Sequence, residues 1–158
     1  MIELQARDIM NRDVLSAGTD WSIDQLAEFF MENSISGAPV IDEDGKLAGV
    51  VSMTDLVRYE SMPCTYGNTG DTPEYYIHTR ERNYSPGEIE SYRVDAESLV
   101  TVRDIMTGVI FSVNEHTRIQ HVADAMLRGK IHRVLVTRDE TLLGIITTMD
   151  ILNAIKDL

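Results

Sequence analysis

The sequence predicts an α/β fold that is built from two copies of one unit, and two observations carry this prediction. The first is the motif Gly49–Asp55 (Gly-Val-Val-Ser-Met-Thr-Asp), which has a near copy at Gly144–Asp150 (Gly-Ile-Ile-Thr-Thr-Met-Asp). Two β-branched apolar residues before a hydroxyl residue and an acidic residue are typical of a buried strand that leads into a helix. The second is a longer repeat around this motif, because Arg7–Met10 recurs as Arg103–Met106 at an offset of 96 residues.

The offset between the copies also locates their one difference in length. Ile35–Val40 recurs as Ile131–Val136 at the same offset of 96, whereas Asp55 and Asp150 are 95 residues apart. One residue is therefore absent from the polar turn that follows Val136, relative to the acidic turn Asp42–Lys46 of the first copy. A deletion confined to a polar turn is what two copies of one folded unit tolerate.

In the first copy, Arg7–Met10 predicts a short helix, and a strand is expected next at Val14–Leu15. Apolar residues then recur at helical spacing between residues 23 and 32, which predicts an amphipathic helix. Ser22 and Gln25 have the spacing of a capping box at its start.

The rest of the first copy predicts a hairpin and a helix. Ala38–Ile41 is typical of a core strand, with Pro39 near its start. Asp42–Gly45 predicts a tight turn into a second strand, Lys46–Val51. The motif helix then runs from about residue 53 to 59.

The second copy predicts the same elements in the same order. They are a strand at Ile110–Phe111, a helix over 119–128, a hairpin over 132–146 and a last helix over 149–156. Thr117 and Gln120 offer a capping box that is one position out of register with the capping box of the first copy.

Residues 60–101 separate the two copies and differ from them in composition. The segment is longer than a structureless loop inside a compact domain should be. Two interpretations stay open. It is either a solvated excursion whose tyrosines, Tyr75, Tyr76 and Tyr92, pack back on the fold, or a lid or partner-docking surface.

The order, spacing and duplication of these motifs resemble the cystathionine-β-synthase (CBS) domain, present twice. The resemblance covers residues 6–59 and 102–156 and leaves 60–101 as an insertion or linker. It implies two β-α-β-β-α repeats that pack through their sheets into one module with pseudo-two-fold symmetry. A ligand cleft is associated with each repeat in this family.

The strand–helix junction in each motif suits a ribose phosphate. Free backbone N–H groups and the helix dipole favour an anion there. The hydroxyl of Ser52 or Thr147 is placed to touch that anion, and the carboxylate of Asp55 or Asp150 to accept hydrogen bonds from a vicinal diol. The alternative is that these residues only cap their helices, each contributing about 1 kcal/mol.

The resemblance adds further ligand contacts. It implies that His132 and Arg133 face the ligand phosphate, to which a guanidinium is well suited. The first copy has Ser36 and Gly37 there and lacks the cations, so its cleft either prefers an uncharged adenosine derivative or stays empty. Two serines lie where family members contact adenine, and two isoleucines are candidates for apolar walls against the base. These four residues are Ser16, Ser112, Ile35 and Ile131.

Composition excludes several other classes of function. A net charge of −12 argues against a nucleic-acid binder and against anionic membrane surfaces. The single cysteine, Cys64, excludes an internal disulfide and a multi-cysteine metal site. His78 and His116 have no partner at metal spacing. No secretion signal is present at the N-terminus, so a cytoplasmic protein is expected.

The sequence therefore predicts a regulatory sensor module without a catalytic residue, a metal or a covalent cofactor. Its expected ligand is AMP, ADP, ATP or S-adenosylmethionine, and its expected partners are a second copy of the chain and an effector protein that the sequence does not identify. A structural dimerisation scaffold with degenerate clefts is the main alternative. An enzyme whose site includes residues 60–101 is a third.

Overall fold

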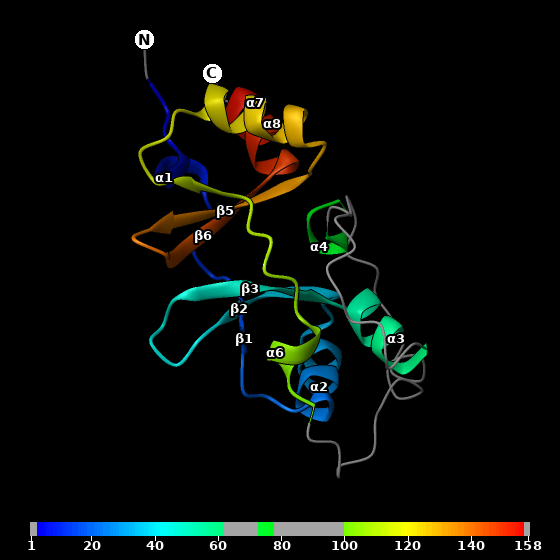
Figure 1. Cartoon of the computed structure of the whole chain (residues 1–158). Coiled ribbons are helices and arrows are strands. Elements are labelled where there is room, and N and C mark those ends of the chain that lie inside the picture. Colours follow the sequence, from blue (N-terminus) through cyan, green and yellow to red (C-terminus); the bar gives the residue numbers. More distant parts are fainter. Residues whose placement is uncertain (1–2, 62–72, 78–99, 157–158) are drawn as a thin grey trace. The chain divides into compact units, whose positions relative to one another are not determined.

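The computed structural model describes residues 3–61, 73–77 and 100–156 (Figure 1). The chain divides into two compact units. The first unit comprises Leu15–Tyr75 and Arg80–Val109, and the second comprises Met1–Val14, Tyr76–Thr79 and Ile110–Leu158. Each unit holds one three-stranded sheet, with the strand order β1-β2-β3 in the first and β4-β5-β6 in the second. The predicted duplicated α/β fold is confirmed.

The first unit contains the body of the first copy of the repeat. Its strands and helices are β1 (Ala17–Gly18), α2 (Ile23–Asn33), β2 (Gly37–Ile41), β3 (Leu47–Ser52), α3 (Met53–Ser61) and α6 (Val102–Ile105). Strand β1 is parallel to β2, and β2 is antiparallel to β3. The order β1-α2-β2-β3-α3 is the β-α-β-β-α unit that the resemblance implies.

The second unit contains the body of the second copy. Its strands and helices are α1 (Ala6–Ile9), β4 (Ser112–Asn114), α7 (Ile119–Gly129), β5 (Arg133–Arg138), β6 (Thr141–Thr147) and α8 (Thr148–Lys156). The pairing of its strands repeats that of the first unit, parallel and then antiparallel. The short helix α4 (Glu74–Ile77) contributes Tyr75 to the first unit and Tyr76 to the second.

Each unit takes a short helix from the other copy of the repeat. In the first unit, the N–H of Val102 at the start of α6 donates to the carbonyl of Trp21 (2.9 Å). In the second, the N–H of Ala6 at the start of α1 donates to the carbonyl of Thr117 (2.8 Å). Ala6 and Val102 are both fully buried. Each compact unit is consequently assembled from both copies of the sequence repeat.

The glycine of each motif lies where the segment that follows the exchanged helix runs alongside the last strand of the sheet. Thr107, which follows α6, exchanges two backbone hydrogen bonds with Val50 on β3, each 2.9 Å long. A Cβ atom at Gly49 would overlap the carbonyl oxygen of Thr107. A Cβ atom at Gly144 would likewise come within 2.8 Å of the carbonyl oxygen of Asn11. Both glycines are therefore required for close approach of a backbone segment.

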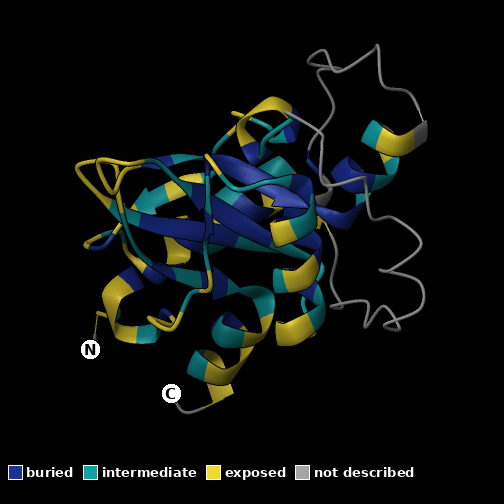
Figure 2. Cartoon of the chain, turned by 90° about the horizontal axis from the view of Figure 1, so that it is seen from below, coloured by how far each residue is buried: buried dark blue, intermediate teal, exposed yellow. Residues whose placement is uncertain are grey.

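The core of the first unit is formed by α2, α3, α6 and the three strands of the sheet. Phe30, Leu26 and Ile23 of α2 are at most 2% exposed, and they pack in one cluster with Val102 and Ile105 of α6. Figure 2 shows buried residues on the strands and on one side of the helices, with exposed residues in the turns. The predicted amphipathic helix over residues 23–32 is confirmed.

The predicted hairpins are also confirmed, and the missing residue lies in the turn. Ile41 pairs with Leu47 in the first unit, and Thr137 pairs with Leu142 in the second. The turn of the second unit places Asp139 and Glu140 at φ values of 47° and 66°, as a tight two-residue hairpin requires.

The first strand of each copy was predicted wrongly at Val14–Leu15 and Ile110–Phe111. The parallel register is set by the central strand, which pairs Ala17 with Val40 and Val113 with Val136. The strands therefore begin two or three residues later than apolar content indicates, and Leu15 is 45% exposed.

The capping box of Ser22 and Gln25 is confirmed, because the N–H of each residue donates to the side chain of the other (2.9 and 3.1 Å). The corresponding prediction for Thr117 and Gln120 is wrong. The N-cap position of α7 is occupied by Arg118, whose side chain makes no capping hydrogen bond. Helix α7 starts at Ile119, which corresponds to Ile23 at the start of α2. Thr117 therefore lies one residue before the N-cap position.

Candidate functional site

The motif of the second unit forms a closed hydrogen-bonded turn at the junction of β6 and α8. Thr147 is the last residue of β6, and its backbone N–H and its hydroxyl both donate to Oδ2 of Asp150, at 2.7 Å each. Both residues are half-buried. No described residue donates a hydrogen bond to the second carboxylate oxygen, Oδ1 of Asp150. The carboxylate thus orders the start of the helix with one oxygen and retains another as an acceptor.

The first unit repeats this turn in a more buried form. The N–H and the hydroxyl of Ser52 donate to Oδ2 of Asp55, at 2.7 and 3.1 Å. Ser52 is 5% exposed and Asp55 8% exposed. The two junctions therefore have the same geometry and differ in access to solvent.

The same hydrogen bonds occur at a helix that is not part of the motif. At the start of α6, the N–H and the hydroxyl of Thr101 donate to Oδ2 of Asp104, at 2.9 and 3.2 Å. A hydroxyl residue three positions before an aspartate is therefore sufficient for helix capping in this protein. What distinguishes the motif is the neighbouring strand and the side chains that it places at the junction.

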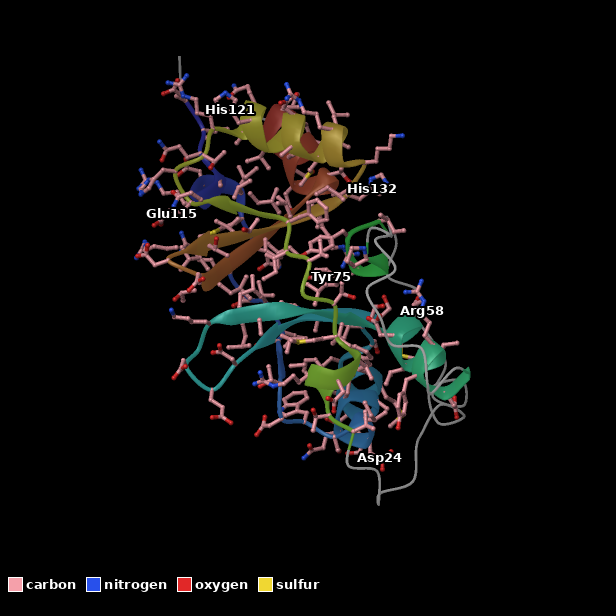
Figure 3. The ribbon with its side chains drawn as sticks, viewed as in Figure 1. Asp24, Arg58, Tyr75, Glu115, His121 and His132 are labelled. Atoms are coloured by element: carbon pink, nitrogen blue, oxygen red, sulfur yellow. The ribbon has the colours of Figure 1, made fainter. Side chains whose placement is uncertain are left out.

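Arg133 and His132 lie beside the junction of the second unit. Arg133 is the first residue of β5 and pairs directly with Thr147 across the antiparallel ladder. The carbonyl of His132 accepts a hydrogen bond from the N–H of Thr148 (3.0 Å). Both residues are half-buried, and His132 is labelled in Figure 3. The structure thus brings Arg133, His132, Thr147 and Asp150 together around one helix N-terminus.

Ser112 and Ile131 occupy the flanks of this site. Ser112 is the first residue of β4 rather than a residue after the strand, and it pairs with Leu135, two residues along β5 from Arg133. Its side chain is exposed. Ile131 is 3% exposed, and its N–H donates to the carbonyl of Met126 on α7 (3.0 Å).

The first unit lacks the cations of the second. Ser36 and Gly37 take the places of His132 and Arg133, and the carbonyl of Ser36 accepts from the N–H of Met53 (2.9 Å). A Cβ atom at Gly37 would lie 2.9 Å from Cδ2 of Tyr75, so the absence of a side chain there accommodates the tyrosine ring. Tyr75, labelled in Figure 3, is 5% exposed.

The remaining candidates of the first unit are Ser16 and Ile35. Ser16 is half-buried and directly precedes β1 instead of following a strand. Ile35 is half-buried, packs against the core cluster, and donates its N–H to the carbonyl of Phe30 (3.1 Å). The ligand-binding roles of these residues stay predictions.

The structure adds a residue that the sequence did not indicate for this site. Tyr76 was expected either to pack back on the fold or to belong to a lid or partner-docking surface, and Tyr75 and Tyr76 are buried; Tyr92 lies outside the described residues. The carbonyl of Tyr76 accepts a hydrogen bond from the N–H of His132 (2.8 Å), and its phenol oxygen accepts one from the N–H of Phe111 (3.1 Å). The Tyr75-Tyr76 pair stands in a segment rich in turn residues and carries no periodic signal that would have identified Tyr76.

A bidentate ion pair lies at the other end of β5. Arg138 makes a bidentate ion pair with the buried carboxylate of Glu115, with 2.7 Å between Nη2 and Oε2. The hydrogen bonds from Arg138 hold the pKa of Glu115 below its usual value. Glu115 is labelled in Figure 3. This pair is separated from Arg133 by the length of the strand and is structural.

Among residues 3–61, 73–77 and 100–156, no three His, Cys, Asp or Glu side chains are grouped so that they could hold a metal ion. Within the same ranges, no helix has the length and apolar character needed to cross a membrane. His78 and Cys64 lie outside these ranges.

Comparison with known proteins gives matches to one family. The family model described as CBS domain matches residues 6–61 and 102–157. An uncharacterized protein, MJ1426, of Methanocaldococcus jannaschii is 30% identical over 94% of this chain and 89% of its own length. The chloroplastic CBS domain-containing protein CBSX1 of Arabidopsis thaliana is 31% identical over 84% of this chain, which spans 55% of that protein.

Solved structures with the same fold include two that contain adenosine compounds. The CBS domain pair of protein MJ0100, in complex with 5′-methylthioadenosine and S-adenosyl-L-methionine, aligns with a TM-score of 0.64 and 21% identity over 99% of this chain and 98% of its own. CBSX2 in complex with AMP aligns with a TM-score of 0.66 and 23% identity over 97% of this chain and 96% of its own. At these identities the likeness establishes the fold.

Proposed function

Because this chain belongs to the CBS-domain family, we propose that it is a regulatory module that binds an adenosine-containing ligand in the site of its second repeat. The ligand is AMP, ADP, ATP or S-adenosylmethionine, bound reversibly. One observation carries the proposal. Arg133 pairs with Thr147 at the N-terminus of α8, where Asp150 keeps one carboxylate oxygen as an acceptor.

Each group at this junction has a chemical role toward such a ligand. Oδ1 of Asp150 accepts hydrogen bonds from the ribose hydroxyls, while Oδ2 continues to cap α8. The first-turn N–H groups of α8 and the guanidinium of Arg133 favour a phosphate, with Thr147 and His132 beside it. Ser112 and Ile131 contact the base. The two related structures that contain adenosine compounds support this ligand class.

The first repeat is proposed to bind an uncharged adenosine derivative or to remain empty. Asp55 and Ser52 are retained, but both are less than 10% exposed, and no cation occupies the positions of Ser36 and Gly37. A phosphate brought to this junction would lack a positively charged side chain from the paired strand. Ser16 and Ile35 would contact the base of a neutral ligand.

The regulatory output requires a partner, and a second copy of this chain is the first that we propose. Four large apolar side chains of α7 and α8 are 56–78% exposed. They are Leu127, Met149, Leu152 and Ile155. The last three recur every third residue and so share one face of α8. Ligand binding would shift such a dimer toward one of its conformations, and an effector protein would bind that conformation preferentially.

The proposal is tested by calorimetric titration with AMP, ATP and S-adenosylmethionine of the wild-type protein and two variants. Asp150→Ala removes both the cap of α8 and the proposed ribose acceptor. Asp104→Ala is the matched control, because it removes the same cap hydrogen bonds from α6, outside the proposed site. We expect binding to at least one compound that Asp150→Ala abolishes and Asp104→Ala preserves.

Two results would point to other functions. If none of the compounds binds the wild-type protein, the alternative of a dimerisation scaffold with degenerate clefts is favoured, and the capping role of Asp55 and Asp150 is sufficient to explain both motifs. If a bound nucleotide is converted to a product during the titration, the protein is an enzyme and residues 60–101 become the first place to seek its catalytic groups.

A further inference from the structure

We propose that Tyr76 fills the base-binding part of the second-repeat site, so that an adenosine-type ligand must displace its side chain in order to bind. The inference rests on the proposed function, since it concerns the same site. It goes beyond the proposed function because it makes Tyr76, a residue of α4 between the two repeats, a competitor of the ligand for that site.

Tyr76 is held at two points that flank the predicted ligand contacts. Its carbonyl accepts the N–H of His132 (2.8 Å), the residue before Arg133. Its phenol oxygen accepts the N–H of Phe111 (3.1 Å), the residue before Ser112. The tyrosine therefore reaches from the proposed phosphate contacts to the strand where the adenine contacts are expected.

The ring of Tyr76 is buried and contacts a second aromatic ring. It makes a T-shaped contact with the ring of Phe111, with 4.9 Å between the centroids. The residue is 0% exposed, although it comes from a helix of four residues. Its neighbour Ile77 on the same helix is 36% exposed. On α4, Tyr75 and Tyr76 are therefore buried in their respective units, and Tyr76 is the one buried in the second unit.

A phenol ring shares the chemical features of a nucleobase that matter here. Both are flat and aromatic, and both present a hydrogen-bond acceptor at the edge of the ring. The N–H of Phe111 donates to the phenol oxygen of Tyr76. A ring nitrogen of adenine accepts a hydrogen bond from the same kind of donor. One N–H and one buried volume cannot serve both rings. Binding of the base and burial of Tyr76 are therefore mutually exclusive.

This competition lowers the apparent affinity of the resting protein. When only a fraction of molecules has the site open, the apparent dissociation constant is the intrinsic constant divided by that fraction. A minor conformation is commonly populated at about 0.1–10%. Removing the tyrosine ring should therefore lower the dissociation constant for AMP by roughly tenfold or more.

The test is a calorimetric titration of AMP into wild type, Tyr76→Ala and Ile77→Ala. Ile77→Ala is the matched control, because it shortens the next side chain of α4, which lies largely outside the core. We expect tighter AMP binding in Tyr76→Ala alone. In the wild-type protein, AMP should also accelerate hydrogen exchange of residues 73–77, because the bound base releases the helix.

A third variant covers the case in which Tyr76→Ala fails to fold. Tyr76→Phe keeps the ring and loses the acceptor of the Phe111 N–H, so it should bind AMP more tightly than wild type by a smaller factor. Unchanged or weaker AMP binding in folded Tyr76 variants overturns the inference, and weaker binding makes the ring a wall of the site. If wild type and all Tyr76 variants fail to bind AMP, the proposed function fails for this ligand as well.

Discussion

Replacing Gly49 by alanine tests the assembly of the first unit from both copies of the repeat. The new Cβ atom would overlap the carbonyl oxygen of Thr107 and lie 3.3 Å from Sδ of Met106. Met106 can move its flexible side chain, but the carbonyl of Thr107 belongs to the backbone. The segment after α6 must then shift away from β3 and weaken the two hydrogen bonds between Thr107 and Val50.

The expected loss of stability follows from these contacts. Two backbone hydrogen bonds contribute about 1 kcal/mol each, and forced displacement of a packed segment costs about 1–3 kcal/mol. Alanine restricts the unfolded chain relative to glycine, which offsets roughly 0.4–1 kcal/mol. The free energy of unfolding of the first unit should therefore fall by about 2–4 kcal/mol.

Urea denaturation followed by the fluorescence of Trp21 measures this change. Trp21 is the single tryptophan of the chain and lies in the first unit, where its carbonyl accepts the N–H of Val102. Gly108→Ala is the matched control, because nothing lies within 4 Å of a Cβ atom there. A Gly49→Ala transition that coincides with those of wild type and Gly108→Ala would refute the close approach of the exchanged segment.

Three further predictions concern the two units and their assembly. The hydrogen bonds from Arg138 lower the pKa of Glu115. Its contribution to stability is therefore present above its unfolded pKa and is lost as pH falls through its folded pKa. Thermal unfolding of Glu115→Gln between pH 3 and 7 should consequently depend less on pH than that of wild type. Ser22→Ala should cost about 1 kcal/mol in urea unfolding, whereas Thr117→Ala should not show the loss of a helix cap. Leu152→Lys should lower the mass measured by light scattering to that of a monomer, and an unchanged dimer would exclude this face of α8.

The helices and hairpins could be predicted because their signals are local and occur twice. Ile23, Leu26 and Phe30 share one face by spacing alone, and the acidic turn after Ile41 marks its own hairpin. The position of the first strand in each copy could not be predicted in this way, because a two-residue strand such as Ala17–Gly18 has no pattern of its own. Its place is decided by the register of the strand beside it, which belongs to tertiary structure.

The exchange of short helices could not be predicted from the repeat. Arg7–Met10 and Arg103–Met106 are identical in sequence, and both would fit either unit by their local pattern. The structure places each in the unit of the other copy, where Ala6 bonds to Thr117 and Val102 bonds to Trp21. A duplicated sequence shows that two units are alike, but it does not show which segments complete each unit.

The two repeats share one hydrogen-bonded turn at their strand–helix junctions. Thr147 and Asp150 make the same hydrogen bonds as Ser52 and Asp55, and Thr101 and Asp104 make them again at α6. The shared turn therefore caps a helix wherever it occurs, and it cannot by itself specify a ligand.

Under the proposed function, ligand specificity comes from the position that faces the turn on the paired strand. In the second unit that position is Arg133, which pairs with Thr147, and in the first it is Gly37, which pairs with Ser52. Arginine supplies a cation for a phosphate, whereas glycine leaves space that the ring of Tyr75 approaches. Exchanging the two residues, as Gly37→Arg and Arg133→Gly, should therefore weaken AMP binding at the second site. Gly37→Arg should not create a site in the first unit, because the added side chain would meet Tyr75.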